Sequence, residues 1–223
     1  MHSNEITNVK KAIKLNRRQR SIIVGTLLGD GHLETCDKGK TYRLKTEHSM
    51  EQKEYVDWLY KELKPLTREL PRARVRLQKL PQGTEIKAQS YGFTTYSLGA
   101  LRFYGQQFYK GKVKIIPKLI SKLLDPISLA VWYLDDVSWK SNHHRTFVIH
   151  THGYPKNELQ KILKALERFD IKASLHMQRR DFGIYWRIYI LSESAGKFKK
   201  IIQPIIQSIP SMRYKLGNIL PKK

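Results

Sequence analysis

Two apolar segments of the sequence each end at an aspartate. Asp30 closes RSIIVGTLLGDG at 20–31, and Asp136 closes ISLAVWYLDDVS at 127–138, so the two carboxylates are 106 positions apart. Aspartate is a poor helix former, and an unpaired carboxylate is costly to bury. Taken singly, each residue is most simply a helix cap or a solvated turn residue. Because the same residue recurs in the same context, we interpret the pair as cation ligands.

Two helices that pack side by side would bring these carboxylates together. The small residues Gly25 and Ala130 would let the helix backbones approach closely. Adjacent carboxylates repel each other unless a cation lies between them, and oxygen ligands suit Mg²⁺. Such an ion can activate a water and stabilise the leaving oxygen of a phosphodiester. Gly29 takes in the first segment the place of Asp135 in the second, so we expect metal ligation there by main-chain carbonyls, not by symmetric side chains.

The elements that must position the two aspartates also occur twice. Each apolar helix is followed by a strand pattern, an amphipathic helix, a hairpin and a further helix. Both halves therefore read αββαββα, and the last helix is expected to break at Pro204. We expect an α+β fold, a compact pseudo-twofold unit with a central helix pair and two antiparallel sheets. The expected segments are a first repeat at 15–110, a connection at 111–125 and a second repeat at 126–223.

The two hairpins begin with strands of alternating polarity. In both 71–78 and 171–178 the even-numbered residues are polar and the odd-numbered residues are apolar. This period-two pattern predicts strands with one exposed polar face and one buried apolar face. The faces of 42–48 and 145–151 stay unassigned, because aligning the two halves sets charged residues of one against apolar residues of the other.

The composition indicates a polyanionic partner. The chain has 223 residues, with 42 Lys+Arg against 19 Asp+Glu, and its net charge is +23. No apolar stretch approaches the ~20 residues of a membrane span, and the basic residues are spread over the whole chain, so nucleic acid is favoured over a membrane surface. Cys36 is the only cysteine, which excludes an internal disulfide and a cysteine zinc site and favours a reducing, intracellular compartment.

Four segments, in order along the chain, resemble one known family. VGTLLGDG (24–31) and LAVWYLDDV (129–137) resemble the paired signature of LAGLIDADG homing endonucleases in their single-chain, two-repeat form. Lys114–Pro117 and Met212–Leu216 are similar to the KxIP and MxYKLP segments of the branch that contains the yeast mitochondrial omega-intron endonuclease. The resemblance extends over nearly the whole chain.

The resemblance implies roles for particular residues. Asp30 and Asp136 would be metal-binding carboxylates, and Lys114 and Lys215 would be the basic active-site residue of each half. A lysine there would stabilise negative charge on the scissile phosphate or position the attacking water. Mg²⁺ is the expected cofactor, with Mn²⁺ able to substitute and Ca²⁺ expected to bind without supporting cleavage. Polar side chains near two equivalent strand ends are candidates for organising solvent, although solvated strand-end residues are the commoner alternative: Glu47, His48 and His152.

The resemblance also implies that the sheets form a saddle whose concave face enters the major groove of DNA. Arginine and glutamine can pair bidentately with guanine and adenine edges. The alternative is that these residues form the solvated face of a sheet and contact phosphates at most. The candidates for base contacts are Arg72, Arg74, Arg76, Gln78, Lys87, Gln89, Ser174, His176, Gln178, Tyr185 and Arg187.

One residue departs from the family pattern. Val137 stands where the family usually has a small residue after the catalytic aspartate, and Gly31 fits that place in the first half. A β-branched residue there means either an ordinary backbone or a perturbed second metal site.

The resemblance predicts a Mg²⁺-dependent monomeric enzyme that makes site-specific double-strand cuts in DNA with short 3′ overhangs during intron homing. The alternatives are an RNA maturase-type splicing cofactor that binds intron RNA, or a catalytically impaired DNA-binding protein on the same fold. The expected location is intracellular, in an organelle matrix (mitochondrion or chloroplast) or the prokaryotic cytoplasm.

Overall fold

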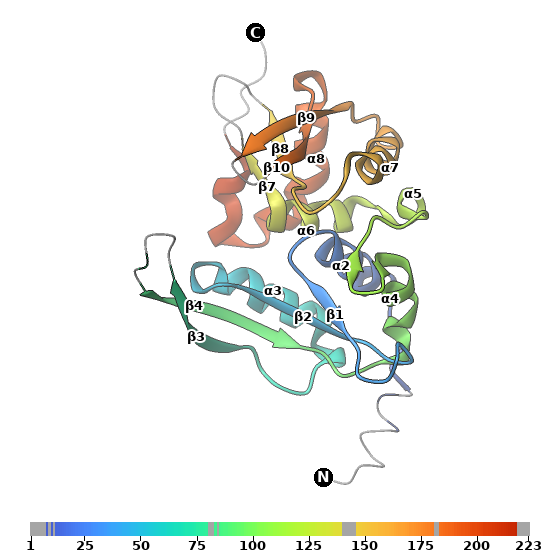
Figure 1. Ribbon diagram of the computed structural model, residues 1–223, viewed down its shortest axis with the longest axis vertical. Coiled ribbons are helices and arrows are strands. Elements are labelled where there is room, and N and C mark those ends of the chain that lie inside the picture. The colour runs from blue at the N-terminus through green and yellow to red at the C-terminus, as the bar shows by residue number, and fades with distance from the viewer. Residues whose placement is uncertain are drawn as a thin grey trace. The chain divides into compact units, whose positions relative to one another are not determined.

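The computed structural model describes residues 8, 10, 12–79, 83, 85–139, 146–180 and 183–217 (Figure 1). The chain forms two compact units. The first contains the residues up to Gln19 together with Asp30–Gly105, and the second contains Arg20–Gly29 and the chain from Gln106 onward. Most of the first apolar helix therefore folds with the second unit, so the compact units differ from the sequence repeats.

The order of elements repeats as the sequence predicts. Each half runs helix, strand, strand, helix, strand, strand, helix, with a short connection between the halves. The first half contains α2 (Arg17–Leu28), β1 (His32–Glu34), β2 (Arg43–Ser49), α3 (Lys53–Leu63), β3 (Arg72–Lys79), β4 (Glu85–Thr94) and α4 (Arg102–Phe108). The connection contains β5 (Tyr109–Lys110), β6 (Val113–Lys114) and α5 (Ile120–Leu123). The second half contains α6 (Pro126–Asp136), β7 (Val137–Trp139), β8 (Phe147–His150), α7 (Lys156–Glu167), β9 (Ala173–Arg180), β10 (Gly183–Ile190) and α8 (Ser192–Gln207).

Short 3-10 helices complete the described chain, at η1 (Met50–Gln52), η2 (Lys64–Leu66), η3 (Gly99–Leu101) and η4 (Pro210–Leu216). No helix in this part of the chain is long and apolar enough to span a membrane.

The prediction that the last helix breaks at Pro204 is wrong, because α8 continues through it to Gln207. Proline removes one main-chain N–H from the helix ladder, which is costly. The buried face of α8, which includes Phe198, Ile202 and Ile206, packs against α6 and offsets that cost.

Each unit contains one four-stranded antiparallel sheet. The strand orders are β1-β2-β4-β3 and β7-β8-β10-β9, so the two sheets have the same topology. In the first sheet His32 pairs with Lys45. In the second sheet Ser138, which lies two residues after its motif aspartate as His32 does, pairs with Val148. The inner strands are therefore equivalent at an offset of 103 residues, three fewer than the offset of the aspartates.

This register assigns the faces of the two inner strands, β2 and β8, which the sequence left unassigned. Leu44 is equivalent to Phe147 and Thr46 to Ile149, and all four side chains are buried. The apparent conflict arose because the spacing between paired residues of the first two strands is three residues shorter in the second half, 138 to 148 against 32 to 45. A shift by an odd number of residues reverses every side chain of a strand.

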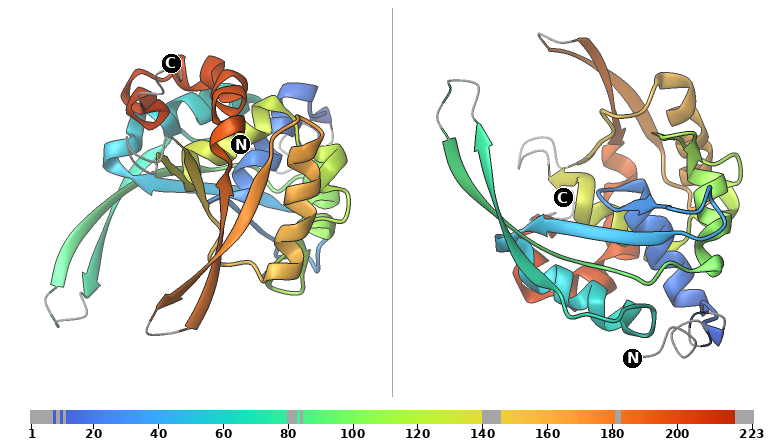
Figure 2. Two further views of the ribbon diagram at one scale, coloured as in Figure 1. Left: turned by 90° about the horizontal axis from the view of Figure 1, so that it is seen from above. Right: turned by 60° about the horizontal axis from the view of Figure 1, so that its bottom comes forward.

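The outer parts of the hairpins are exposed on both faces, contrary to the prediction that their apolar face is buried. Val75 and Leu77 on β3 are 60% and 68% exposed, and Met177 and Ile184 on the second hairpin are 51% and 56% exposed. In the first unit α3 packs on β2 and β4, whereas β3 is the edge strand. Figure 2 shows each hairpin continuing as a twisted ribbon past the helix that covers its sheet.

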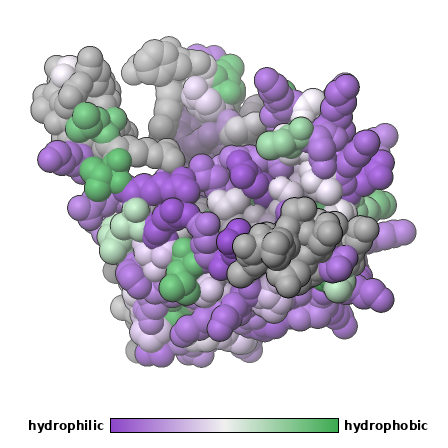
Figure 3. All heavy atoms as spheres, turned by 90° about the horizontal axis from the view of Figure 1, so that it is seen from below, coloured by the Kyte–Doolittle hydropathy of each residue, from purple (hydrophilic) through white to green (hydrophobic). Residues whose placement is uncertain are grey.

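The surface agrees with the basic composition. Figure 3 shows one face of the molecule, where hydrophilic residues predominate and apolar residues are scattered among them. Such a hydrophilic face is consistent with a sequence in which 27% of the residues are charged.

Candidate active site and nucleic-acid interface

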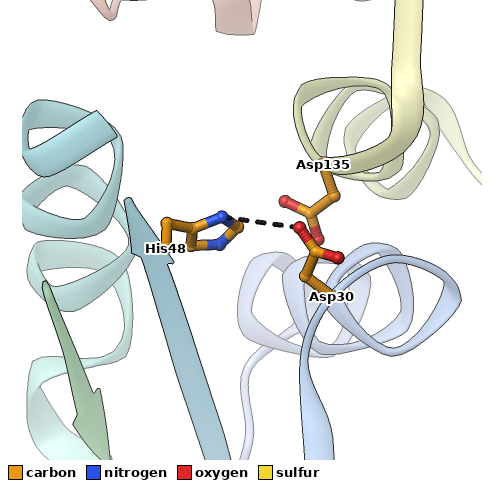
Figure 4. Close-up of side chains that lie close together, drawn as sticks. All are labelled: Asp30, His48 and Asp135. Carbon is orange, nitrogen blue, oxygen red and sulfur yellow. Dashed lines mark ion pairs between the residues drawn. The ribbon is translucent and has the colours of Figure 1, made fainter. Parts of the chain in front are cut away.

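Asp30 lies just outside its helix, because α2 ends at Leu28. Its carboxylate is 53% exposed, and its Oδ2 lies 3.6 Å from Nδ1 of His48 on β2 (Figure 4). The His48 side chain is only 2% exposed, and its ring meets the Tyr55 ring edge-on at 5.1 Å. The packing of His48 thus fixes a ring nitrogen beside an exposed carboxylate.

A hollow of about 440 Å³ in the first unit contains this pair. Glu47 also lines it, accepting a hydrogen bond from Ser90 Oγ at 2.6 Å and another from Arg74 Nη1 at 3.3 Å. Lys45 Nζ lies 3.6 Å from the same carboxylate. Glu47 is therefore held by neighbours on the face of the sheet that α3 does not cover, which we call the open face.

Asp136 is the last residue of α6 and has different neighbours. Trp132, one turn earlier, donates its indole N–H to Asp136 Oδ2 at 3.2 Å. Tyr154 donates its hydroxyl to the Leu28 carbonyl at 3.4 Å. Burial raises the pKa of Tyr154, and the nearby Asp136 charge raises it further, so the phenol stays protonated as a donor.

A second hollow, of about 310 Å³, is formed wholly by the second unit and contains Asp136. It brings together Lys114 from the connection, Asp136 from α6 and five consecutive residues that begin with the last residue of β8. The residues that line it are Leu28, Gly29, Lys114, Asp136, His150, Thr151, His152, Gly153 and Tyr154.

Both predicted lysines bind a main-chain carbonyl at the end of a motif helix. Lys114 Nζ donates to the Gly29 carbonyl at 2.7 Å, and Lys215 Nζ donates to the Leu134 carbonyl. Tyr133 in turn donates its hydroxyl to the Lys215 carbonyl. The last carbonyls of a helix have no partner within the helix and carry partial negative charge, which suits an ammonium. This contact distinguishes Lys114 and Lys215 from ordinary surface lysines.

The two motif helices approach each other closely within the second unit. A Cβ on Gly25 would lie 2.5 Å from the Ser128 carbonyl and 2.6 Å from Val131 Cβ, so glycine is required there. Ala130 is fully buried in α6. Ser21 donates its hydroxyl to Asp125, which caps α6. The predicted role of Gly25 in the helix contact is therefore confirmed.

The asymmetry between Gly29 and Asp135 has a packing cause. A Cβ on Gly29 would overlap the Asp135 carboxylate and Cβ. The absence of a side chain at one position accommodates the side chain at the other. The pair is complementary, so a symmetric arrangement of two aspartates would not fit.

The backbone at Val137 is ordinary. Val137 has φ −111° and ψ 144°, begins β7 and is 3% exposed. Gly31 is not among the glycines with positive φ in the described chain. Neither position requires the conformational freedom of glycine, so Val137 does not strain the end of α6.

The register corrects the pairing of the strand-end histidines. At the offset of 103 residues, Glu47 is equivalent to His150 and His48 to Thr151, so His48 and His152 do not correspond. His150 Nε2 lies 2.8 Å from Ser138 Oγ, and His152 accepts a hydrogen bond from Arg187 Nε at 3.0 Å. Sequence reasoning missed His150, Tyr154 and Trp132. The strand register would have identified His150. That register depends on how many residues connect the first two strands, and this number differs between the halves.

The candidate base-contacting residues of the first sheet divide between its two faces. Arg72 pairs with Gly92, which pairs with Glu47, and Arg74 pairs with Ser90, so these residues share the open face. Arg76 and Gln78 occupy the same alternate positions of β3. Lys87 instead pairs with Leu77, and Gln89 pairs with Val75. The prediction that Lys87 and Gln89 share the face of Arg72 is wrong, because the turn between the strands sets which alternate residues face the same side.

In the second sheet the candidates occupy one face. His176 pairs with Arg187, which pairs with His150, and Gln178 pairs with Tyr185. Ser174 pairs with Tyr189 on the same face. Arginine and lysine are prominent on the open face of the first sheet, whereas histidine and tyrosine are prominent on the same face of the second sheet.

Comparison with known proteins agrees with these features. Residues 20–198 match the model of the LAGLIDADG DNA endonuclease family. The chain is 30% identical over 217 residues to the DNA endonuclease I-ChuI of Chlamydomonas applanata, covering 92% of this chain and 97% of that protein. It is 31% identical over 217 residues to the cytochrome b mRNA maturase bI2 of Saccharomyces cerevisiae, covering 92% of this chain but 49% of the maturase. The solved structure of the homing endonuclease I-WcaI bound to its DNA recognition sequence has a TM-score of 0.85 at 23% identity, covering 98% of this chain and 95% of that one.

The chain belongs to the LAGLIDADG DNA endonuclease family. The predictions of the family, of an α+β fold with antiparallel sheets and of DNA endonuclease activity are confirmed.

Proposed function

We propose that this endonuclease hydrolyses one phosphodiester in each strand of a long duplex site, leaving short 3′ overhangs, and that it works as a monomer. Asp30 and Asp136 are the proposed metal-binding carboxylates, and Lys114 and Lys215 are the proposed basic residues. One observation carries the proposal: each motif segment ends at an aspartate, and a lysine ammonium binds a carbonyl at each of these helix ends.

The donor set suits a hard divalent cation. The two carboxylates and the carbonyls of Gly29 and Asp135 offer the oxygen ligands that Mg²⁺ prefers. The Gly29 carbonyl accepts a hydrogen bond from Lys114 but has a second lone pair. When bound, the ion would supply an activated water and neutralise charge at the leaving oxygen. Mn²⁺ is expected to replace Mg²⁺, and Ca²⁺ to bind without supporting cleavage.

The surrounding residues hold charge and protons in place. The Lys114 and Lys215 ammonium groups would stabilise negative charge that develops on the phosphate. Trp132 donates to Asp136 and so orients its carboxylate. His48 beside Asp30, together with His150 and His152 in the other hollow, are proposed to orient water near the carboxylates.

The open faces of the two sheets are the proposed DNA-binding surfaces. Arg72 and Arg74 suit recognition of guanine, and Gln178 suits recognition of adenine. Tyr185 and Arg187 lie on the open face of the second sheet, where Arg187 is fixed by His152. Contacts to phosphates from the same surfaces would position the duplex without reading its sequence.

A second candidate function is support of intron splicing as a maturase. The similarity to the Saccharomyces cerevisiae maturase favours it, although this chain spans about half of that protein's length. The alternative of a catalytically impaired protein rested mainly on Val137. The backbone at Val137 is ordinary, so this residue gives no reason to expect a perturbed metal site.

The test combines a library of duplex target sites with Mg²⁺ or Ca²⁺ and compares the wild type with D30N/D136N. We expect double-strand cuts by the wild type in Mg²⁺, binding without cuts in Ca²⁺, and binding without cuts by the variant in either ion. Tight binding with no Mg²⁺-dependent cuts by the wild type would overturn the proposal. Stronger binding of structured intron RNA than of any duplex would favour the maturase function.

A further inference from the structure

The peptide segment that carries Lys114 is held by two charged side chains of α7. Glu158 Oε2 accepts a hydrogen bond from the Ile116 N–H at 2.9 Å. Lys161 Nζ donates to the Ile116 carbonyl at 3.1 Å and to Glu158 Oε1 at 2.7 Å. Both main-chain polar groups of Ile116 are therefore bound by one ion pair, which we call the α7 clamp (Glu158 and Lys161).

The α7 clamp differs from an ordinary surface ion pair. The Glu158 and Lys161 side chains are 18% and 32% exposed, and Ile116 is fully buried. For comparison, Lys197 and Asp170 form an ion pair in the same unit with side chains 50% and 84% exposed. Hydrogen bonds to charged groups are strong when sheltered from solvent, so the clamp constrains the backbone more than an exposed pair would.

The main chain also anchors this segment, at Lys114 and at Ile115. The Ile115 N–H donates to the Phe108 carbonyl at 2.8 Å, and Lys114 pairs with Tyr109 in the two-residue ladder of β5 and β6. So short a ladder gives little stability of its own. The clamp follows two residues later and completes the support of the strand from which Lys114 reaches the Gly29 carbonyl at 2.7 Å.

We propose that Glu158 and Lys161 are positioning residues that hold the Lys114 ammonium at the end of α2. The proposal rests on the active-site role proposed above for Lys114. Neither clamp residue lines the hollow that contains Lys114 and Asp136, so each would act through the backbone. A displacement of about 1 Å at a reacting group can cost about a hundredfold in rate, so loss of the clamp should affect the chemical step.

The experiment measures single-turnover cleavage of each DNA strand separately, using the full chain and its selected duplex site in Mg²⁺. We expect E158A and K161M to slow cleavage about tenfold to a hundredfold, with the same strand pattern as K114M. The double variant E158A/K114M should be no slower than K114M, since both changes remove one function. E158Q should retain most activity, because its amide oxygen can still accept the Ile116 N–H.

Matched measurements separate positioning from general destabilisation. E167A removes an exposed glutamate at the end of the same helix and should leave both strand rates unchanged. Duplex affinity of E158A in Ca²⁺ should stay within about twofold of the wild type, because the clamp is expected to act on the chemical step and not on the sheet faces.

The outcomes distinguish this inference from the proposed function. If K114M slows one or both strands and E158A cuts like the wild type, the positioning role is overturned while the proposed function stands. The positioning role would also be overturned if the effects of E158A and K114M were fully additive. It would likewise be overturned if E158A slowed cleavage of both strands equally and lowered the melting temperature. If K114M cuts at the wild-type rate, the active-site role of Lys114 itself fails.

Discussion

The two motif aspartates are the same residue in different local surroundings. Asp30 follows the end of its helix, is 53% exposed and faces a buried imidazole. Asp136 is the last residue of its helix and accepts an indole N–H from Trp132. An imidazole can exchange protons, whereas the indole is only a donor. The helix end therefore sets where each carboxylate lies, while neighbouring strands and helix turns set its electrostatic support.

The sheets differ in the same way. The open face of the first presents several arginines and a lysine next to Glu47, whereas that of the second presents Arg187 together with His150, His176 and tyrosines. Arginine and lysine carry fixed positive charge at neutral pH, and histidine is largely neutral there. We therefore expect the first sheet to supply more of the salt-dependent affinity for DNA.

The largest expected effect comes from removing either carboxylate. D30N and D136N should each slow cleavage of one strand by at least about a thousandfold, because loss of a metal ligand removes several kcal/mol of transition-state stabilisation. Each variant should accumulate nicked duplex, and the nick should lie on opposite strands in the two variants. Strand-resolved gels measure this. Equal loss on both strands in both variants would mean that the two carboxylates serve one shared centre.

A smaller effect is expected from the complementary pair at the helix ends. G29A should lower the free energy of unfolding by about 1–3 kcal/mol, because the added methyl overlaps Asp135. G29A/D135G should recover part of that loss, less the cost of glycine in a helix. Urea denaturation compares the variants, with D135G alone as the control. Full additivity of the two changes would contradict the proposed packing.

The support of Asp136 by Trp132 gives the next test. W132F keeps an aromatic ring but removes the N–H donor, which is worth about 1.5 kcal/mol or about tenfold in rate. The slowing should appear on the DNA strand whose cleavage D136N slows and not on the other strand. A melting curve checks that the fully buried ring at this position still packs. Equal slowing of both strands would point to core damage instead.

The smallest expected effect distinguishes the two faces of the first hairpin. R74A should weaken binding of the target duplex about fivefold in Ca²⁺, through loss of one base or phosphate contact. K87A removes the same charge from the opposite face of the same hairpin and should change the Kd by less than about twofold. Fluorescence anisotropy at two salt concentrations measures both. A K87A effect as large as that of R74A would show that the open face is not the main contact surface.

Several features of the protein were determined by local sequence. The repeated apolar helices ending at aspartate, the period-two strands and the net charge of +23 predicted the order of elements, the α+β fold and a nucleic-acid partner. These patterns succeed because helix and strand periodicity depend on neighbouring residues. The motif segments and the family resemblance singled out Asp30, Asp136, Lys114 and Lys215, whose active-site roles stay a proposal, and both lysines contact a carbonyl at a helix end.

Other features were decided only by tertiary structure. The face of Lys87 and Gln89 depends on strand register, which a turn of different length reverses. The equivalence of Glu47 and His150 depends on the spacing between paired residues of the first two strands, which is three residues shorter in the second half. The α7 clamp joins Ile116 to Glu158, 42 residues apart, through contacts that no local pattern records. Local sequence specifies which side chains can do chemistry, whereas pairing between distant segments decides which of them meet.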